Sequence, residues 1–181
     1  MEKSESWLLF LFHQLGEYAP FILIFATILL LHKKPYFQFY YIVFLFVNTL
    51  LNTFLKQLIQ QPRPSVDKKH FARILEKNKK YVSSFGFPYG IYGMPSGHAQ
   101  SVFFSTAYAW FTFRNVPLVI IFSLLSLLSI CQRVVYNHHT VMQVIVGSLV
   151  GLMVGSLAYR FARQTIGGKF SGKKDDFGGF V

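Results

Sequence analysis

Charge is scarce in this sequence, and acidic charge is the scarcest. Only 14% of the 181 residues are charged, whereas a soluble domain usually carries roughly 25%. Seven acidic residues stand against eighteen lysines and arginines, so the formal net charge is +11. This composition argues against the alternative of a soluble all-helical domain, because too few charged side chains remain to cover its surface.

Cysteine is nearly absent. Cys131 stands alone, so no intrachain disulfide can form, and cysteine usage does not indicate a redox compartment. A signal peptide is not expected either. Residues 1–5 (MEKSE) carry two acids and one base, and no small-residue cleavage site follows Leu8–Phe12.

Long apolar runs, in contrast, are abundant, and 52% of the residues are hydrophobic. A helix needs about 20 mainly apolar residues to cross a bilayer. The lysines and arginines lie between the runs, as in membrane proteins, so the basic charge does not indicate a nucleic-acid partner. We expect an all-α, polytopic membrane bundle of five to six helices. Its clear spans are Tyr18–Leu31, Tyr36–Leu58, His98–Phe113, Pro117–Cys131 and Thr140–Phe161.

The two ends of the chain differ from this central region. Trp7–Leu15 is apolar but short, so it is either the end of a sixth helix or a helix in the membrane interface. We expect residues 1–17 to form an interfacial or re-entrant segment, 18–166 the membrane domain and 167–181 a disordered basic tail. Within the last span, Gly147, Gly151 and Gly155 could let another helix approach closely or could simply be tolerated.

Three polar segments interrupt the apolar pattern: KQLIQQPRP (56–64), PSGH (95–98) and RVVYNHH (133–139). Ionisable groups at the ends of membrane helices are costly, so each segment is a candidate for function. The chain does not cross the membrane between the first two segments, and it crosses twice between the second and the third. All three should therefore lie on one face of the membrane.

Together these segments could bind a phosphoryl group. Lys56, Arg63 and Arg133 supply fixed positive charge, and arginine matches phosphate oxygens well. Ser96 and Gly97 open a helix, whose N-terminal N–H groups attract anions. Each residue also has a simpler interpretation. Lys56 and Arg63 could extend to the interface, and Pro95-Ser96 could only cap a helix.

Histidines could provide the chemistry. His98 and either His138 or His139 could divide the roles of nucleophile and general acid. Alternatively, His138 and His139 could be polar interface residues. No HExxH or HxxxH pattern indicates a metal site. We therefore expect no metal and no cofactor, because the cations can neutralise the transition state by themselves.

The same residues match a known pattern. The chain resembles the type 2 phosphatidic acid phosphatase/vanadium haloperoxidase superfamily, whose motifs are K-x6-RP, PSGH and SR-x5-H-x3-D. Lys56 precedes Arg63-Pro64 with the first spacing, residues 95–98 match the second motif, and Arg133 precedes His139 with the third spacing. The resemblance implies a bundle of about six transmembrane helices.

It also implies a role for each residue. His139 would form a phosphohistidine, and His98 would be the general acid. The phosphate would be held by residues from all three motifs: Lys56, Arg63, Ser96, Gly97 and Arg133.

Two positions depart from the pattern. Gln132 replaces the serine of the third motif, and Gln143 replaces its aspartate. A glutamine oxygen can still accept the Nδ1 proton of His139 and orient the ring, but it brings no charge. If Gln143 only orients His139, an aspartate should be tolerated there. The dolichyl diphosphate phosphatases share this variation, with YGMPS-x-H and HT-x2-QV, as in Tyr92–His98 and His139–Val144 here.

That likeness implies hydrolysis of a polyprenyl diphosphate to its monophosphate, at a lumenal site in a membrane of the endoplasmic reticulum type. Other activities stay open: a broader phosphatase acting on phosphatidic acid, a non-catalytic lipid-binding protein, or vanadate-dependent peroxidation. Unencumbered bases flank the helices on the opposite face, which favours a cytoplasmic C-terminus. The sequence does not indicate an oligomeric state.

Overall fold

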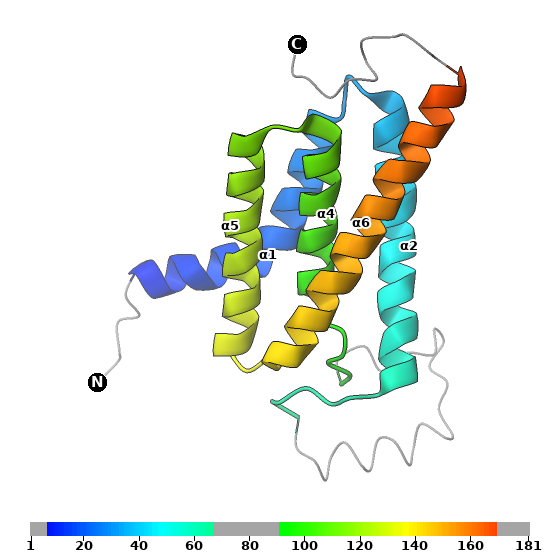
Figure 1. Ribbon diagram of the computed structural model, residues 1–181. Helices are drawn as coiled ribbons and strands as arrows, with labels where there is room; N and C mark the ends of the chain where they lie inside the picture. The colour runs from blue at the N-terminus through cyan, green and yellow to red at the C-terminus, as the bar shows by residue number, and fades with distance from the viewer. Residues whose placement is uncertain (1–6, 67–90, 170–181) are drawn as a thin grey trace.

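The computed structural model describes residues 7–66 and 91–169, with side chains described as far as Thr165. Over these residues the protein is a bundle of five helices (Figure 1). They are α1 (Trp7–Leu30), α2 (Pro35–Ile59), α4 (Gly97–Phe113), α5 (Val116–Val135) and α6 (Val141–Lys169). The all-helical fold is as predicted. Residues 67–90, between α2 and α4, lie outside the described residues.

The helix ends follow from local sequence. Pro35 and Pro117 stand in the first turns of α2 and α5, where a missing N–H costs nothing. Ser96 caps α4, and Asn115 caps α5 by accepting the N–H of Leu118 at 2.9 Å. Gln60 ends α2 in a left-handed conformation with φ 51°.

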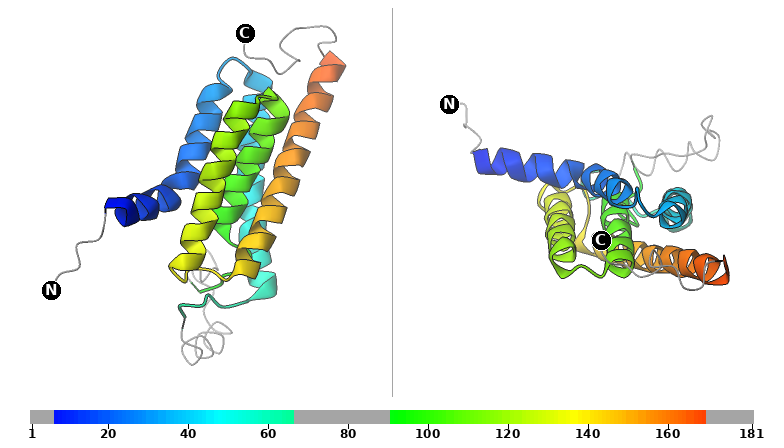
Figure 2. Two further views of the ribbon diagram at one scale, coloured as in Figure 1. Left: turned by 60° about the vertical axis from the view of Figure 1, so that its left-hand side comes forward. Right: turned by 90° about the horizontal axis from the view of Figure 1, so that it is seen from above.

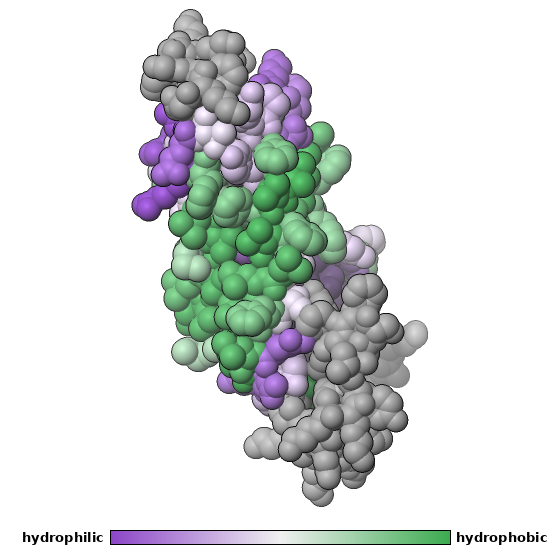
Figure 3. Space-filling view, turned by 90° about the vertical axis from the view of Figure 1, so that its right-hand side faces the viewer, coloured by the Kyte–Doolittle hydropathy of each residue, from purple (hydrophilic) through white to green (hydrophobic). Residues whose placement is uncertain are grey.

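Four of the helices are long and apolar enough to cross a membrane, namely α1, α2, α5 and α6. Large apolar side chains cover their outer surface, including Phe46 and Phe54 on α2 and Leu149 on α6. Figure 3 shows the resulting apolar belt between two more polar ends. With 17 residues, α4 is about 25 Å long, shorter than the others. It lies inside the bundle, in contact with α1, α2, α5 and α6.

Glycines explain why α6 lies so close to α4. A methyl group on Gly147 would lie 2.5 Å from the carbonyl oxygen of Ser96, and one on Gly155 would lie 2.5 Å from that of Phe104. A methyl group on Gly151 would likewise collide with the carbonyl oxygen of Gln100. Of the two interpretations of these glycines, close helix approach is therefore the one that the packing supports.

The described parts of the two predicted terminal segments, residues 7–17 and 167–169, belong to helices. Trp7–Leu15 is the first section of α1, and it runs sideways out of the bundle with most of its apolar side chains exposed (Figures 1 and 2). Pro20 lies inside this helix, and a proline removes a helical hydrogen bond and bends the axis. At the other end, α6 continues to Lys169, three residues into the predicted tail. Residues 170–181 lie outside the described residues.

Candidate active site

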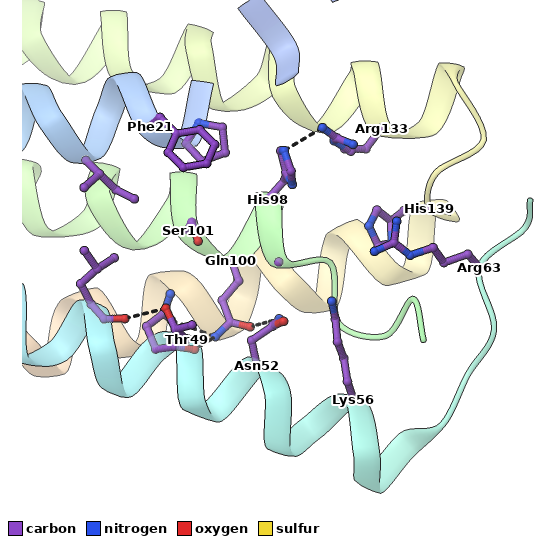
Figure 4. A pocket seen from close by; sticks show the side chains of 15 residues that line it. Phe21, Thr49, Asn52, Lys56, Arg63, His98, Gln100, Ser101, Arg133 and His139 are labelled. Atoms are coloured by element: carbon purple, nitrogen blue, oxygen red, sulfur yellow. Dashed lines mark hydrogen bonds between the residues drawn. The ribbon is translucent and has the colours of Figure 1, made fainter. Parts of the chain in front are cut away.

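The predicted site residues from all three polar segments lie at one end of the bundle (Figure 4). Lys56 is in the last turn of α2, Arg133 is in the last turn of α5, and His139 follows α5. Lys56 is 6% exposed, Arg133 4% and His139 3%. Together with Arg63 and His98 they line one cavity. We call Lys56, Arg63 and Arg133 the cation cluster.

A short backbone pairing holds the first two segments together. The N–H of Arg63 donates to the carbonyl of Ile91 at 3.1 Å, and the N–H of Gly93 donates to the carbonyl of Gln61 at 2.7 Å. Arg63 is thereby held beside the entrance to α4, although it belongs to no helix. This pairing supplies the order that Arg63 needs to act as a fixed cation.

Ser96 and Gly97 play different parts. The Oγ of Ser96 accepts the N–H of Ala99 at 3.5 Å, and its own N–H donates to the carbonyl of Gln143 at 3.0 Å. Ser96 is fully buried and does not line the cavity, so it acts as the cap of α4 in this arrangement. Gly97 does line the cavity. A methyl group at Gly97 would lie 3.3 Å from Oδ1 of Asn52, which leaves little space for a side chain.

His139 and Gln143 form a pair. Nδ1 of His139 lies 3.1 Å from Oε1 of Gln143. The Nε2 amide of Gln143 donates to Oε1 of Gln61 at 3.0 Å and to the carbonyl of Pro62 at 2.9 Å, which fixes the orientation of the amide. Oε1 of Gln143 must then accept, so Nδ1 of His139 carries the proton and Nε2 is left with a lone pair.

This geometry revises the expectation for position 143. Oε1 of Gln143 also accepts the N–H of Thr140 at 3.2 Å, so both ends of the amide are used. A carboxylate would keep the acceptor half but lose both donations, and it would face two oxygens, those of Gln61 and Pro62. Aspartate at 143 should therefore be damaging rather than tolerated.

Burial sets the protonation state of His139. Removal from water and, to a smaller extent, the positive charge of Arg63 lower the pKa of His139 to about 3, while the hydrogen bond that Nδ1 donates to Gln143 opposes the shift. The ring is therefore neutral at physiological pH, as a nucleophile must be. Burial also lowers the pKa of Arg63, but an arginine stays charged.

The geometry also separates His139 from His138. His138 is only half-buried and does not line the cavity; its ring stacks on Tyr136 at a centroid distance of 6.4 Å. Motif spacing alone favoured His139, and burial beside the cation cluster now favours the same residue.

His98 lies across the cavity from His139, on the first turn of α4. Its Nε2 is 2.7 Å from Nη2 of Arg133 and 3.2 Å from the carbonyl oxygen of Glu17. The Glu17 carboxylate is paired with Arg133, and its Oε1 lies 3.8 Å from Nε2 of His98. Sequence reasoning missed Glu17 as a site residue. The available signal was an acidic residue within an apolar segment, which is costly without a partner.

A buried polar layer also escaped prediction. Nδ2 of Asn52 donates to Oε1 of Gln100 at 2.8 Å and to the carbonyl of Pro95 at 3.3 Å. The Nε2 amide of Gln100 donates to Oδ1 of Asn48 at 2.9 Å. This layer ties the beginning of α4 to α2, one turn from Lys56. The four-residue spacing of Asn48 and Asn52 on an apolar helix was its signal.

The cavity has a volume of about 470 Å³ and two unlike ends. The cation cluster and the two histidines form one end. Apolar side chains of α1 and α2 line the other: Pro20, Phe21, Ile24 and Leu45. Such a cavity can hold a phosphoryl group next to an apolar chain. Within residues 7–66 and 91–169, no cluster of three metal-binding side chains is found.

Comparison with known proteins agrees with the family resemblance seen in the sequence motifs. The PAP2 superfamily profile matches residues 37–166, well over half of the chain. A dolichyldiphosphatase of Saccharomyces cerevisiae is 32% identical over 123 residues, which cover 62% of this chain and 46% of that protein. The match thus spans about half the length of this curated relative. No solved structure matches. Because the profile covers well over half of the sequence, this chain belongs to the PAP2 superfamily.

Proposed function

We propose that this protein hydrolyses a polyprenyl diphosphate, of the dolichyl type, to the monophosphate through a phosphohistidine. One observation carries the proposal: a single cavity joins the cation cluster and both histidines to an apolar wall. A diphosphate headgroup fits the charged end, and the first isoprenoid units fit the apolar end. The similarity to a yeast dolichyldiphosphatase supports the same substrate class.

In the proposed reaction the two histidines divide the work. Nε2 of His139 attacks the terminal phosphorus, and an N–P bond forms as the bridging P–O bond breaks. His98 gives its proton to the leaving oxygen of the lipid monophosphate. Water then attacks the phosphohistidine, His98 takes the water proton, and inorganic phosphate leaves. Lys56, Arg63 and Arg133 neutralise the phosphoryl oxygens in both steps.

The identity of the substrate can be tested directly. Purified protein is offered a polyprenyl diphosphate, phosphatidic acid or glucose 6-phosphate, and released phosphate is measured, with His139→Ala as the blank. We expect the polyprenyl diphosphate to give the highest kcat/KM. Equal values for phosphatidic acid would replace the proposal with a broad lipid phosphatase. Phosphate binding without turnover of any substrate would indicate a non-catalytic lipid-binding protein.

We further propose that the site faces the lumen of the endoplasmic reticulum. Unencumbered bases flank the helix ends on the opposite face, among them Lys33, Lys34 and Arg114. A glycosylation acceptor placed near Lys77 should be modified in microsomes, and one near Ser171 should not. Both positions lie outside the described residues. Modification near Ser171 alone would invert the topology.

A further inference from the structure

Among the described residues, the acidic residue at the cation cluster is Glu17. The other six acidic residues lie outside the described ranges: Glu2, Glu5, Asp67, Glu76, Asp175 and Asp176. The carboxylate of Glu17 is paired with Arg133, which the family pattern assigns to phosphate. Glu17 therefore pairs with a guanidinium that a phosphoryl oxygen would also bind.

The backbone holds Glu17 in this place. Pro20 has no N–H, so the carbonyl of Gly16 lacks its usual helical partner. That carbonyl instead accepts the hydroxyl of Ser129 on α5 at 2.8 Å. A methyl group at Gly16 would lie 2.5 Å from Cβ of Gln132, so α1 and α5 touch just before Arg133. The contact between Glu17 and Arg133 is thus built into the helix packing.

The contacts of Arg133 conflict with the role proposed for His98. A guanidinium only donates, so in its contact with Nη2 of Arg133 at 2.7 Å the Nε2 of His98 accepts and carries no proton. The other contact of Nε2, with the carbonyl of Glu17 at 3.2 Å, needs a proton on Nε2, because a carbonyl only accepts. A general acid needs that proton. A phosphoryl group that draws the guanidinium away would free Nε2. The nearest carboxylate oxygen is then Oε1 of Glu17, at 3.8 Å, with the Glu17 carbonyl at 3.2 Å.

We propose that Glu17 is a positioning residue that exchanges partners during turnover. Before a phosphoryl group binds, it balances Arg133 and leaves His98 neutral. When a phosphoryl group binds Arg133, Glu17 turns to His98 and stabilises its protonated form. One proton is taken up from solution on binding and is returned when the product leaves. The inference rests on the proposed phosphatase function, because the partner exchange protonates His98, the general acid of that reaction.

The other titratable groups described around His98 do not stabilise its protonated form. Arg133 of α5 and Arg63 from the loop after α2 are cationic and oppose a charge on His98. Lys56 of α2, which lines the same cavity, brings no negative charge. His139, from the loop before α6, is neutral. The titratable residues of α6 with described side chains, Tyr159, Arg160 and Arg163, lie towards its far end. Gln143 brings no charge where the family has an aspartate, so Glu17 supplies the negative charge that the described site contains.

Proton uptake on binding of inorganic phosphate gives the test, because it does not depend on the lipid substrate. Calorimetry at pH 8 in buffers of different ionisation enthalpy counts the protons taken up per phosphate bound. We expect wild-type protein to take up close to one, and Glu17→Gln and His98→Gln to take up less than half of that. In Glu17→Gln, kcat should fall by about tenfold or more, and the alkaline limb of its pH profile should move to lower pH.

A matched control moves the carboxylate by one helical turn. The double variant Glu17→Gln with Gln14→Glu keeps the net charge and should not restore proton uptake. Equal uptake in wild type and Glu17→Gln, or full recovery in the double variant, would overturn the inference. If the wild type fails to cleave polyprenyl diphosphate but keeps Glu17-dependent proton uptake, the substrate proposal fails and the role of Glu17 stands.

Discussion

Replacing Gln143 by leucine tests the most connected side chain of the site. Leucine is similar in size, so the change removes the amide with little change in volume. Four contacts are lost: to Nδ1 of His139, the N–H of Thr140, Oε1 of Gln61 and the carbonyl of Pro62. Gln143 is fully buried, so water cannot easily replace it.

The size of the effect follows from these contacts. A buried polar group left without a partner costs about 1–3 kcal/mol. The loss at Nδ1 releases the His139 ring from the tautomer and orientation needed for attack. If about 1.4–3 kcal/mol of this appears in the barrier, the rate falls roughly 10- to 150-fold. The losses at Gln61 and Pro62 act on stability instead, because they join α6 to the segment after α2.

The assay is phosphate release under single-turnover conditions, together with thermal unfolding in the same detergent. Gln143→Glu should also be slow, because its carboxylate faces the oxygens of Gln61 and Pro62. Gln38→Leu is the matched control, since its half-buried amide donates to the carbonyl of Ile28 at 3.3 Å, far from the site. Wild-type rates for both variants at position 143 would refute the role assigned to the amide.

Further outcomes follow from the same geometry. His139→Ala should abolish turnover, whereas His138→Ala should keep substantial activity; the reverse ranking would contradict the assignment of the nucleophile. Activity should survive excess EDTA, and loss restored by Mg²⁺ would contradict the cation-cluster mechanism. Since the pKa of His139 lies near 3, its protonation should not slow kcat/KM between pH 7 and 5, and Arg63→Gln should move this acid limb to higher pH. Gly151→Leu should prevent proper assembly of the bundle, as measured by thermal unfolding and yield.

Sequence reasoning succeeds here where a pattern is local or strictly spaced. Apolar runs of membrane length predict the helices, and their boundaries agree within a few residues for α2, α4 and α5. Counting membrane crossings places three distant polar segments at one end, where the structure has them. Both predictions depend only on helix length and on the cost of burying charge.

Contacts between helices are harder to predict. In the sequence, Glu17 interrupts two apolar runs. The residues around it do not indicate that Arg133 will lie beside it. The contact depends on the bend at Pro20 and on the close approach of Gly16 to α5, which are properties of packing. The revised expectation for aspartate at 143 depends on packing for the same reason. The partners Gln61 and Pro62 lie about eighty residues away along the chain.

The glycine prediction shows how packing positions the chemistry. A side chain on Gly151 would collide with the backbone of Gln100 and would lie 3.0 Å from the N–H nitrogen of Phe104, and backbone cannot move aside as a side chain can. Overpacking usually costs about 1–3 kcal/mol, and a leucine here must push α6 from α4. The N–H of Ser96 would then part from the carbonyl of Gln143, now 3.0 Å away, and His139 would leave the cavity. Leu149→Phe enlarges the outward face of α6 and should leave stability and rate unchanged. Equal unfolding temperatures for Gly151→Leu and Leu149→Phe would refute this account of the α4–α6 contact.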